Sequence, residues 1–173
     1  MNKSLLYFLF IATSCSNGYA AEVQKRITIN AELALNTCAL TLSPTNVNFQ
    51  EVSLSQLENN AATPQTVSLD IDCSWPASGV SFKFSPAKGV STSAANLMKT
   101  GLSGVGLELF WKNNGSTDFV STDFSKTISP TVTTLSEKQT TLGQFQLLPK
   151  KIPEEKLQAG NISTTLTVEV TYE

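Results

Sequence analysis

The stretch Gly160-Asn-Ile-Ser-Thr-Thr-Leu-Thr-Val-Glu-Val-Thr-Tyr-Glu173 alternates apolar and polar residues up to the end of the chain. Thr164 shares one face of this stretch with the residues Ile162, Leu166, Val168, Val170 and Tyr172. Because successive side chains of a strand point to opposite faces, the alternation predicts a half-buried β-strand. A core strand needs a neighbour on each side. Since the chain ends at Glu173, we expect one neighbour of this strand to come from another molecule.

The N-terminus has the order of features that is typical of a secretory signal peptide. Lys3 supplies a positive charge, residues 5–12 form a short apolar run, and Gly18-Tyr19-Ala20 places small residues at the cleavage positions. We therefore predict a signal peptide over residues 1–20. The apolar run is shorter than the roughly 20 residues that cross a membrane, so we expect a soluble, exported mature protein.

The three cysteines have different expected fates. Cys15 leaves with the signal peptide. In an alternative interpretation, residues 12–15 form a lipoprotein box in which Cys15 is acylated and anchors the chain. Cys38 and Cys73 remain as an even pair in a chain bound for an oxidising compartment, so we predict a disulfide between them. A metal site would need two more soft ligands, and the chain contains no histidine, so we expect no metal and no cofactor.

The length of the chain indicates a single domain, and its charge argues against binding to polyanions. Removal of 20 residues from 173 leaves 153, which is the size of a single domain with its own core. The whole chain has 12 basic and 14 acidic residues, and the loss of Lys3 with the signal makes the mature chain slightly more acidic. This balance argues against nucleic acid and anionic membranes as partners.

The absence of histidine also argues against an enzyme. Ser-His-Asp and Cys-His mechanisms are excluded, and so is most zinc-dependent hydrolysis. A mechanism with paired carboxylates remains, but Asp70 and Asp72 alternate with apolar residues and are expected to face solvent. Glu154 and Glu155 lie in a charged segment that contains proline. We therefore expect no catalytic residues.

Short strands are expected along most of the mature chain, with no long helical period. Alternation predicts strands at Val23–Leu35, Thr66–Trp75, Val80–Phe84, Val105–Trp111 and Leu142–Leu147. Asn114-Gly115 suits a hairpin turn that needs a positive φ. Leu54–Asn59 and Ala94–Lys99 are expected to form single helical turns, and Pro149–Ala159 is expected to be a charged connector. The predicted fold is all-β: an antiparallel sandwich with Greek-key connections.

The strand count after Cys38 is about one short of a complete immunoglobulin-like sandwich, while Val23–Asn30 is longer than a first strand needs. Both observations are explained if this segment pairs with the terminal strand of another molecule, which is donor-strand complementation. We therefore expect a donor-strand extension over residues 21–30 and a sandwich domain over residues 31–173. The donor side chains would be Val23, Lys25, Ile27 and Ile29.

The chain resembles the pilins of bacterial chaperone–usher fimbriae. The resemblance rests on the signal peptide, the alternating N-terminal extension and four further segments: Ala31–Cys38, Leu69–Cys73, Thr100–Leu109 and the C-terminal run. In that family, a glycine fourteen residues from the end and a penultimate aromatic mark the segment that binds the chaperone. Here Gly160 and Tyr172 hold these places. Family members that polymerise usually have a glycine in the extension, whereas residues 21–30 contain none and carry Lys25.

The resemblance implies a structural fimbrial subunit on the bacterial surface that supports cell adhesion. It implies four kinds of partner: a periplasmic chaperone, an outer-membrane usher, other pilin subunits in a head-to-tail polymer, and a host receptor. The acceptor strand would present Gly160, Ile162, Leu166, Val168, Val170 and Tyr172, with the Glu173 carboxylate held by basic groups of the chaperone.

Other interpretations remain open at this stage. The terminal strand could be an ordinary edge strand of a complete sandwich, with the N-terminal segment folded back on its own domain. The chain could be a self-contained secreted or tip-located adhesin, in which Trp75 and Trp111 stack against a sugar. The chain could also belong with the secreted proteins that resemble spore coat protein U, which have a related layout.

Overall fold

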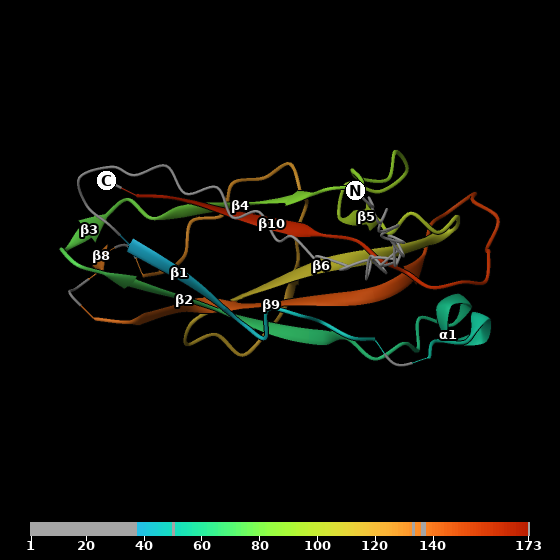
Figure 1. Cartoon of the computed structure of the whole chain (residues 1–173), viewed down its shortest axis with the longest axis horizontal. Helices are drawn as coiled ribbons and strands as arrows, with labels where there is room; N and C mark the ends of the chain where they lie inside the picture. The colour runs from blue at the N-terminus through green and yellow to red at the C-terminus, as the bar shows by residue number, and fades with distance from the viewer. Residues whose placement is uncertain (1–37, 50, 133, 136–137, 173) are drawn as a thin grey trace, which may run out of the picture. The chain divides into compact units, whose positions relative to one another are not determined.

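The computed structural model describes residues 38–49, 51–132, 134–135 and 138–172, which Figure 1 draws in colour. Several predictions fall outside these residues. They are the signal peptide over residues 1–20 with Cys15, the donor strand over residues 21–30 with Val23, Lys25, Ile27 and Ile29, and the Glu173 carboxylate.

The described residues form mostly strands. In chain order, the elements are β1 (Cys38–Ser43), α1 (Leu54–Glu58), β2 (Gln65–Cys73), β3 (Ala77–Ser78), β4 (Ser81–Pro86), β5 (Leu97–Lys99), β6 (Val105–Asn113), β7 (Val120–Ser121), β8 (Thr134–Leu135), β9 (Thr140–Lys151) and β10 (Leu166–Thr171).

The strands form one large and two small antiparallel sheets. The large sheet has the order β1-β2-β9-β6-β5, and β7 pairs with the far half of β6. β10 pairs with β4, and β3 pairs with β8. Neighbours in the large sheet are distant in sequence, as in β2 beside β9, so the sheet depends on long-range contacts (Figure 1).

The core lies between the large sheet and the β4–β10 pair. Phe82 and Phe84 of β4 are 1% exposed, and they meet aromatic rings of the large sheet. The ring centroids of Phe82 and Trp111 are 4.5 Å apart, and those of Phe84 and Phe145 are 5.0 Å apart. Because β6 and β9 supply these partners, the two sheets pack face to face. The predicted all-β antiparallel sandwich is confirmed.

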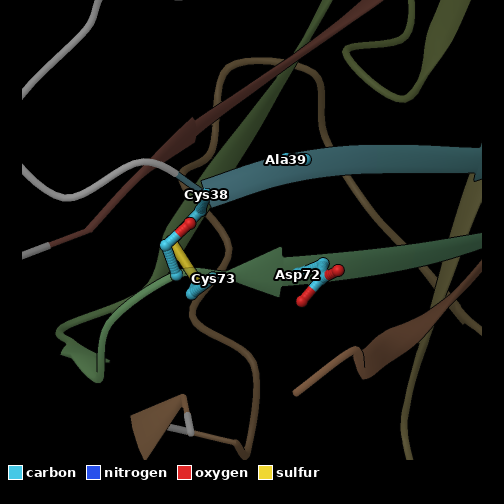
Figure 2. Close-up of a pocket in the computed structure, with 5 residues that line it drawn as sticks. Cys38, Ala39, Asp72 and Cys73 are labelled. Carbon is cyan, nitrogen blue, oxygen red and sulfur yellow. A yellow bond between two sulfur atoms is a disulfide. The ribbon is translucent and has the colours of Figure 1, made fainter. Parts of the chain in front are cut away.

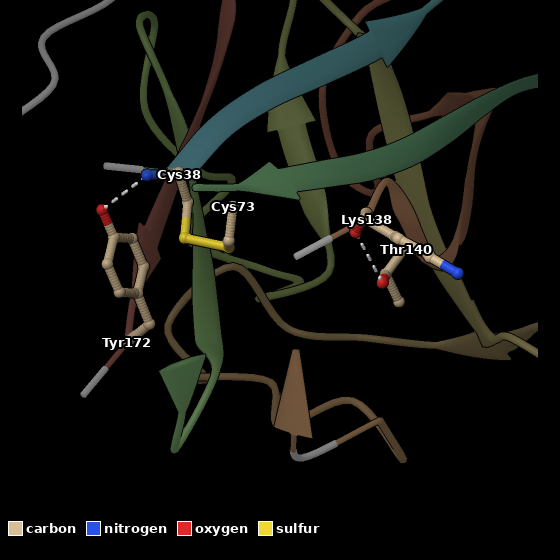
Figure 3. Close-up of a disulfide and its surroundings, with 5 residues drawn as sticks. All are labelled: Cys38, Cys73, Lys138, Thr140 and Tyr172. Atoms are coloured by element: carbon tan, nitrogen blue, oxygen red, sulfur yellow. Dashed lines mark hydrogen bonds between the residues drawn. A yellow bond between two sulfur atoms is a disulfide. The ribbon is translucent and has the colours of Figure 1, made fainter. Parts of the chain in front are cut away.

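The predicted disulfide is also confirmed. Cys38 opens β1 and lies directly opposite Cys73, the last residue of β2, with a Cα–Cα distance of 4.0 Å (Figure 3). The bond therefore fastens the start of β1 to the large sheet.

Two local predictions are correct. α1 lies within the predicted helical turn at Leu54–Asn59, and Ser53 caps it with a reciprocal pair of hydrogen bonds to Gln56. Gly115 has a φ of 82° in the turn after β6, where Ser116 N donates to Asn113 O.

Two other local predictions are wrong. Ala94–Lys99 is not a helical turn, because Leu97–Lys99 forms β5, which pairs with β6 and buries Leu97 and Met98. The connector predicted from Pro149 begins later, because β9 continues to Lys151. Proline is tolerated at this position because β2 pairs with β9 only as far as Leu147, so Pro149 lies beyond the end of that ladder.

Candidate strand-acceptor site

The C-terminal segment keeps the predicted alternation. Val168 is 9% exposed, the odd-numbered residues from Asn161 to Thr171 are exposed, and the other even-numbered residues are half-buried: Ile162, Thr164, Leu166, Val170 and Tyr172. We call the six even-numbered residues the C-terminal row. Strand pairing is shorter than predicted, since β10 covers only Leu166–Thr171.

The residues before β10 are fixed by other contacts. Ala87 N donates to Thr165 O at 2.9 Å, and Thr164 Oγ1 donates to Lys99 O at 3.4 Å. Gly160 lies against Leu102, whose Cδ1 would be 3.0 Å from a Cβ at this position. This contact gives a local packing reason for the glycine.

β10 is paired along one edge. Its partner is β4, with Leu166 opposite Pro86 and Thr171 opposite Ser81. Among the described residues, no strand pairs with the second edge of β10. Glu169 and Lys83 face each other on the exposed side of this pair, so the charges of the two strands lie away from the core.

β1 is the corresponding edge of the large sheet. It pairs with β2 from Cys38 to Ser43, and the sheet order ends on it within the described chain. Cys38, Leu40 and Leu42 are half-buried and pack against the core, while the residues between them are exposed. Sequence reasoning missed the role of Leu40 and Leu42, although their alternation with Ala39, Thr41 and Ser43 is visible in the sequence.

A hydrogen bond joins the two edge strands. Cys38 N donates to Tyr172 Oη at 3.2 Å, across 134 residues of sequence (Figure 3). The Cys38 N–H therefore points away from β2 and toward the C-terminal segment. The first residue of β1 and the residue that follows β10 therefore lie at the same end of the two sheets.

The arrangement suits the binding of an extended peptide. The edge of a sheet presents backbone donors and acceptors that can pair with another strand. Here two such edges, one from each sheet, carry half-buried apolar side chains that point toward one core. A peptide between them would pair with the backbone of β10 and cover the C-terminal row together with Leu40 and Leu42.

The other predicted sites do not form comparable clusters. Trp111 is 5% exposed and belongs to the core, whereas Trp75 is 62% exposed, so the two tryptophans do not make one sugar-stacking surface. Asp70 accepts a hydrogen bond from Thr141 Oγ1 at 2.6 Å, and Glu155 Oε2 accepts one from Gly104 N at 2.9 Å. Both carboxylates thus have structural contacts.

Two features are absent from the described residues. No group of three or more His, Cys, Asp or Glu residues is placed to hold a metal ion. In the same part of the chain, no helix has the length and apolar character needed to span a membrane.

Comparison with known proteins gives consistent matches. The family model described as "Fimbrial protein" matches residues 11–173. Protein FanG of Escherichia coli is 23% identical over 175 residues, covering 99% of this chain and 97% of FanG.

Two solved structures share the fold. The P pilus rod subunit PapA has a TM-score of 0.56 and 15% identity, covering 79% of this chain and 99% of PapA. A subunit in the structure of a chaperone–usher pilus also has a TM-score of 0.56, with 17% identity, covering 94% of this chain and all of that one. The predicted incomplete immunoglobulin-like fold agrees with these neighbours.

Proposed function

The chain belongs to the fimbrial protein family, and from that premise we propose that β1 and β10 are the two walls of a groove that accepts a strand from another subunit. Membership gives the coarse function directly. The chain is a structural subunit of a bacterial fimbria, it is exported to the cell surface, it polymerises with other pilin subunits, and it is not an enzyme. We infer that the chain polymerises by accepting a strand of another subunit in this groove.

The proposal rests on the incomplete burial of the C-terminal row. Four apolar residues of this row, Ile162, Leu166, Val170 and Tyr172, pack against the core yet stay half-buried. Within the described residues, β10 has one strand partner. A second strand would bury the remainder of these side chains and pair the second edge of β10.

The segment that fits this groove in another copy of the chain is residues 21–30. Val23, Ile27 and Ile29 alternate with polar residues, as the groove requires. Full burial of each would contribute about 1.5 to 3 kcal/mol before the entropy of ordering is subtracted. Lys25 shares their face, and its ammonium would stay in water at the rim of the groove while its stem packs.

The order of assembly completes the proposal. A periplasmic chaperone first supplies a strand to the groove and holds the Glu173 carboxylate with basic side chains. At an outer-membrane usher, the extension of the next subunit replaces the chaperone strand. Because donor and acceptor are different surfaces of one chain, the contact is head-to-tail and propagates into a fibre. Adhesion to a host receptor would be a property of the assembled fibre.

Deletion of residues 21–30 from the mature chain tests the acceptor groove directly. The deleted chain should be insoluble or dependent on the chaperone, because its groove has no strand to fill it. A peptide covering Val23–Asn30, added in trans or fused after Glu173, should restore soluble protein. A peptide with Ile27→Asp and Ile29→Asp is the matched control and should not. A stable, soluble monomer from the deletion alone would contradict the proposal.

A further inference from the structure

Two exposed apolar side chains lie at opposite ends of β2. Among the described residues, the large apolar side chains that are most exposed are Leu54 at 51%, Trp75 at 62% and Val120 at 64%. Leu54 opens α1, which precedes the start of β2, and Trp75 follows the end of β2. A nine-residue strand is about 30 Å long, so these two side chains mark opposite ends of the large sheet. In Figure 1, α1 and β3 lie at these two ends.

The Trp75 end is where the described domain begins. Cys38, Ala39, Asp72, Cys73 and Ser74 line a hollow here, directly before Trp75 in sequence (Figure 2). β1 starts at this end and leads away from it, because Cys38 lies opposite Cys73. The chain that precedes Cys38 is therefore joined to the described domain at this end.

β10 runs from the side of the domain that carries α1 toward the Trp75 end (Figure 1). Leu166 pairs with Pro86 at the end of β4 that is remote from β3, while Thr171 pairs with Ser81 near β3. α1 is held in place by Leu57, which is 4% exposed, and by the capping box of Ser53 and Gln56. These contacts keep Leu54 on the outside of a fixed turn.

The direction of a donor strand follows from its two neighbours. β1 leads away from the Trp75 end and β10 leads toward it, so a strand between them is antiparallel to only one of the two. Antiparallel pairing is slightly more stable per residue. β10 offers the more complete edge, because the Cys38 N–H of β1 is already bonded to Tyr172 Oη. A donor strand that is antiparallel to β10 runs toward the α1 end of the acceptor. Its last residue, residue 30, therefore lies on that side.

The length of the connection limits how far apart the donor and acceptor domains can lie. Residues 31–37 join the extension to Cys38, and seven extended residues span at most about 25 Å. We propose that the Trp75 end of each donor subunit packs against the α1 end of the subunit that accepts its strand, with Trp75 and Leu54 in one apolar contact. This contact rests on the strand exchange proposed above and adds a second interface to it.

A pair of mature subunits tests the contact. In the donor, the groove is filled by a copy of residues 21–30 fused after Glu173, so the donor cannot accept a strand. Trp75→Ser in the donor should raise the dissociation rate of the pair in denaturant at least about tenfold, as truncation of a buried interface tryptophan does. Leu54→Gln in the acceptor should also raise it. The double variant should be no faster than Trp75→Ser alone, since both changes remove one contact.

The control variants carry each change on the subunit where the proposed contact does not use that residue, or change a residue outside the contact. Trp75→Ser in the acceptor, Leu54→Gln in the donor and Val120→Gln in either should leave the dissociation rate within about twofold. Acrylamide quenching of the tryptophan emission should fall when the pair forms, and this fall should be absent with Trp75→Phe in the donor. Free peptide 21–30 should cause no such fall.

The outcomes separate this inference from the proposed function. If peptide 21–30 does not bind the groove, strand exchange itself fails, and the contact fails with it. If the peptide binds but no Trp75 or Leu54 variant exceeds the Val120→Gln control, the contact alone is overturned. If Trp75→Ser acts and Leu54→Gln does not, the assignment of the α1 end is wrong, and the contact as proposed is overturned.

Discussion

β2 and β10 have the same alternating sequence pattern but different burial. In β2, the inward residues Val67, Leu69 and Ile71 are at most 2% exposed. In β10, Val168 is 9% exposed, and Leu166 and Val170 remain half-buried. β2 lies between β1 and β9, whereas β10 has one partner among the described residues. Alternation therefore predicts which face of a strand is apolar, and the pairing of its edges decides how completely that face is buried.

The largest expected effect lies in β2. Leu69→Ala should lower the free energy of unfolding by about 3 to 5 kcal/mol, because Leu69 is 0% exposed and the cavity cannot fill with water at low cost. Urea unfolding of the protein with a donor strand fused after Glu173 measures this loss. Asp72→Asn, on the exposed face of the same strand, should change the value by less than about 0.5 kcal/mol. A loss below 1 kcal/mol for Leu69→Ala would remove the contrast between β2 and β10.

The disulfide tests how firmly the β1 edge is held. Cys38→Ser with Cys73→Ser should cost about 3 to 4 kcal/mol on the loop-entropy model, because the bond closes a loop with a sequence separation of 35. The same fused protein, unfolded in urea with and without reductant, gives an independent value. Equal stability of the oxidised and reduced forms would show that β1 is held by its pairing with β2 alone.

A change in β10 sharpens the comparison further. Leu166→Ala should weaken the binding of peptide 21–30 by about tenfold or more, which is roughly 1.5 to 2 kcal/mol, because the proposed donor strand would complete the burial of Leu166. Peptide titration measures the affinity. Thr167→Ala, on the exposed face next to it, serves as the control, and equal affinities for the two variants would argue that no strand covers the C-terminal row.

The smallest expected effect concerns the bond between the two edges. Tyr172→Phe removes the acceptor of the Cys38 N–H and should cost about 1 kcal/mol in the fused protein. Thermal unfolding in matched buffers measures the difference. A neutral result would mean that water replaces the hydroxyl and that the edges need no direct link.

Much of the fold could be predicted from the sequence because strands signal their faces locally. The inward residues of β2, β4 and β6 and the alternation of the C-terminal row follow from a period of two. The disulfide follows from an even pair of cysteines in an exported chain.

The remainder depends on contacts between distant segments. Ala94–Lys99 has no strong strand signal, and β5 forms only because β6 offers Glu108 and Gly106 as partners for Leu97 and Lys99. The packing of Leu40 and Leu42 against the core depends on how the two sheets meet, which no local pattern contains. The donor residues Val23, Lys25, Ile27 and Ile29 lie outside the described chain and remain a prediction.

The position of the disulfide has a mechanical consequence for a fibre under tension. Force applied through the N-terminal extension would enter the domain at Cys38, the first residue of β1. Without a covalent link, the hydrogen bonds between β1 and β2 would break one after another from that end. Because Cys38 is bonded to Cys73, the force passes instead into β2, where the ladder to β9 resists it as a group. The bond lies at the point where a pulled subunit would otherwise begin to unravel.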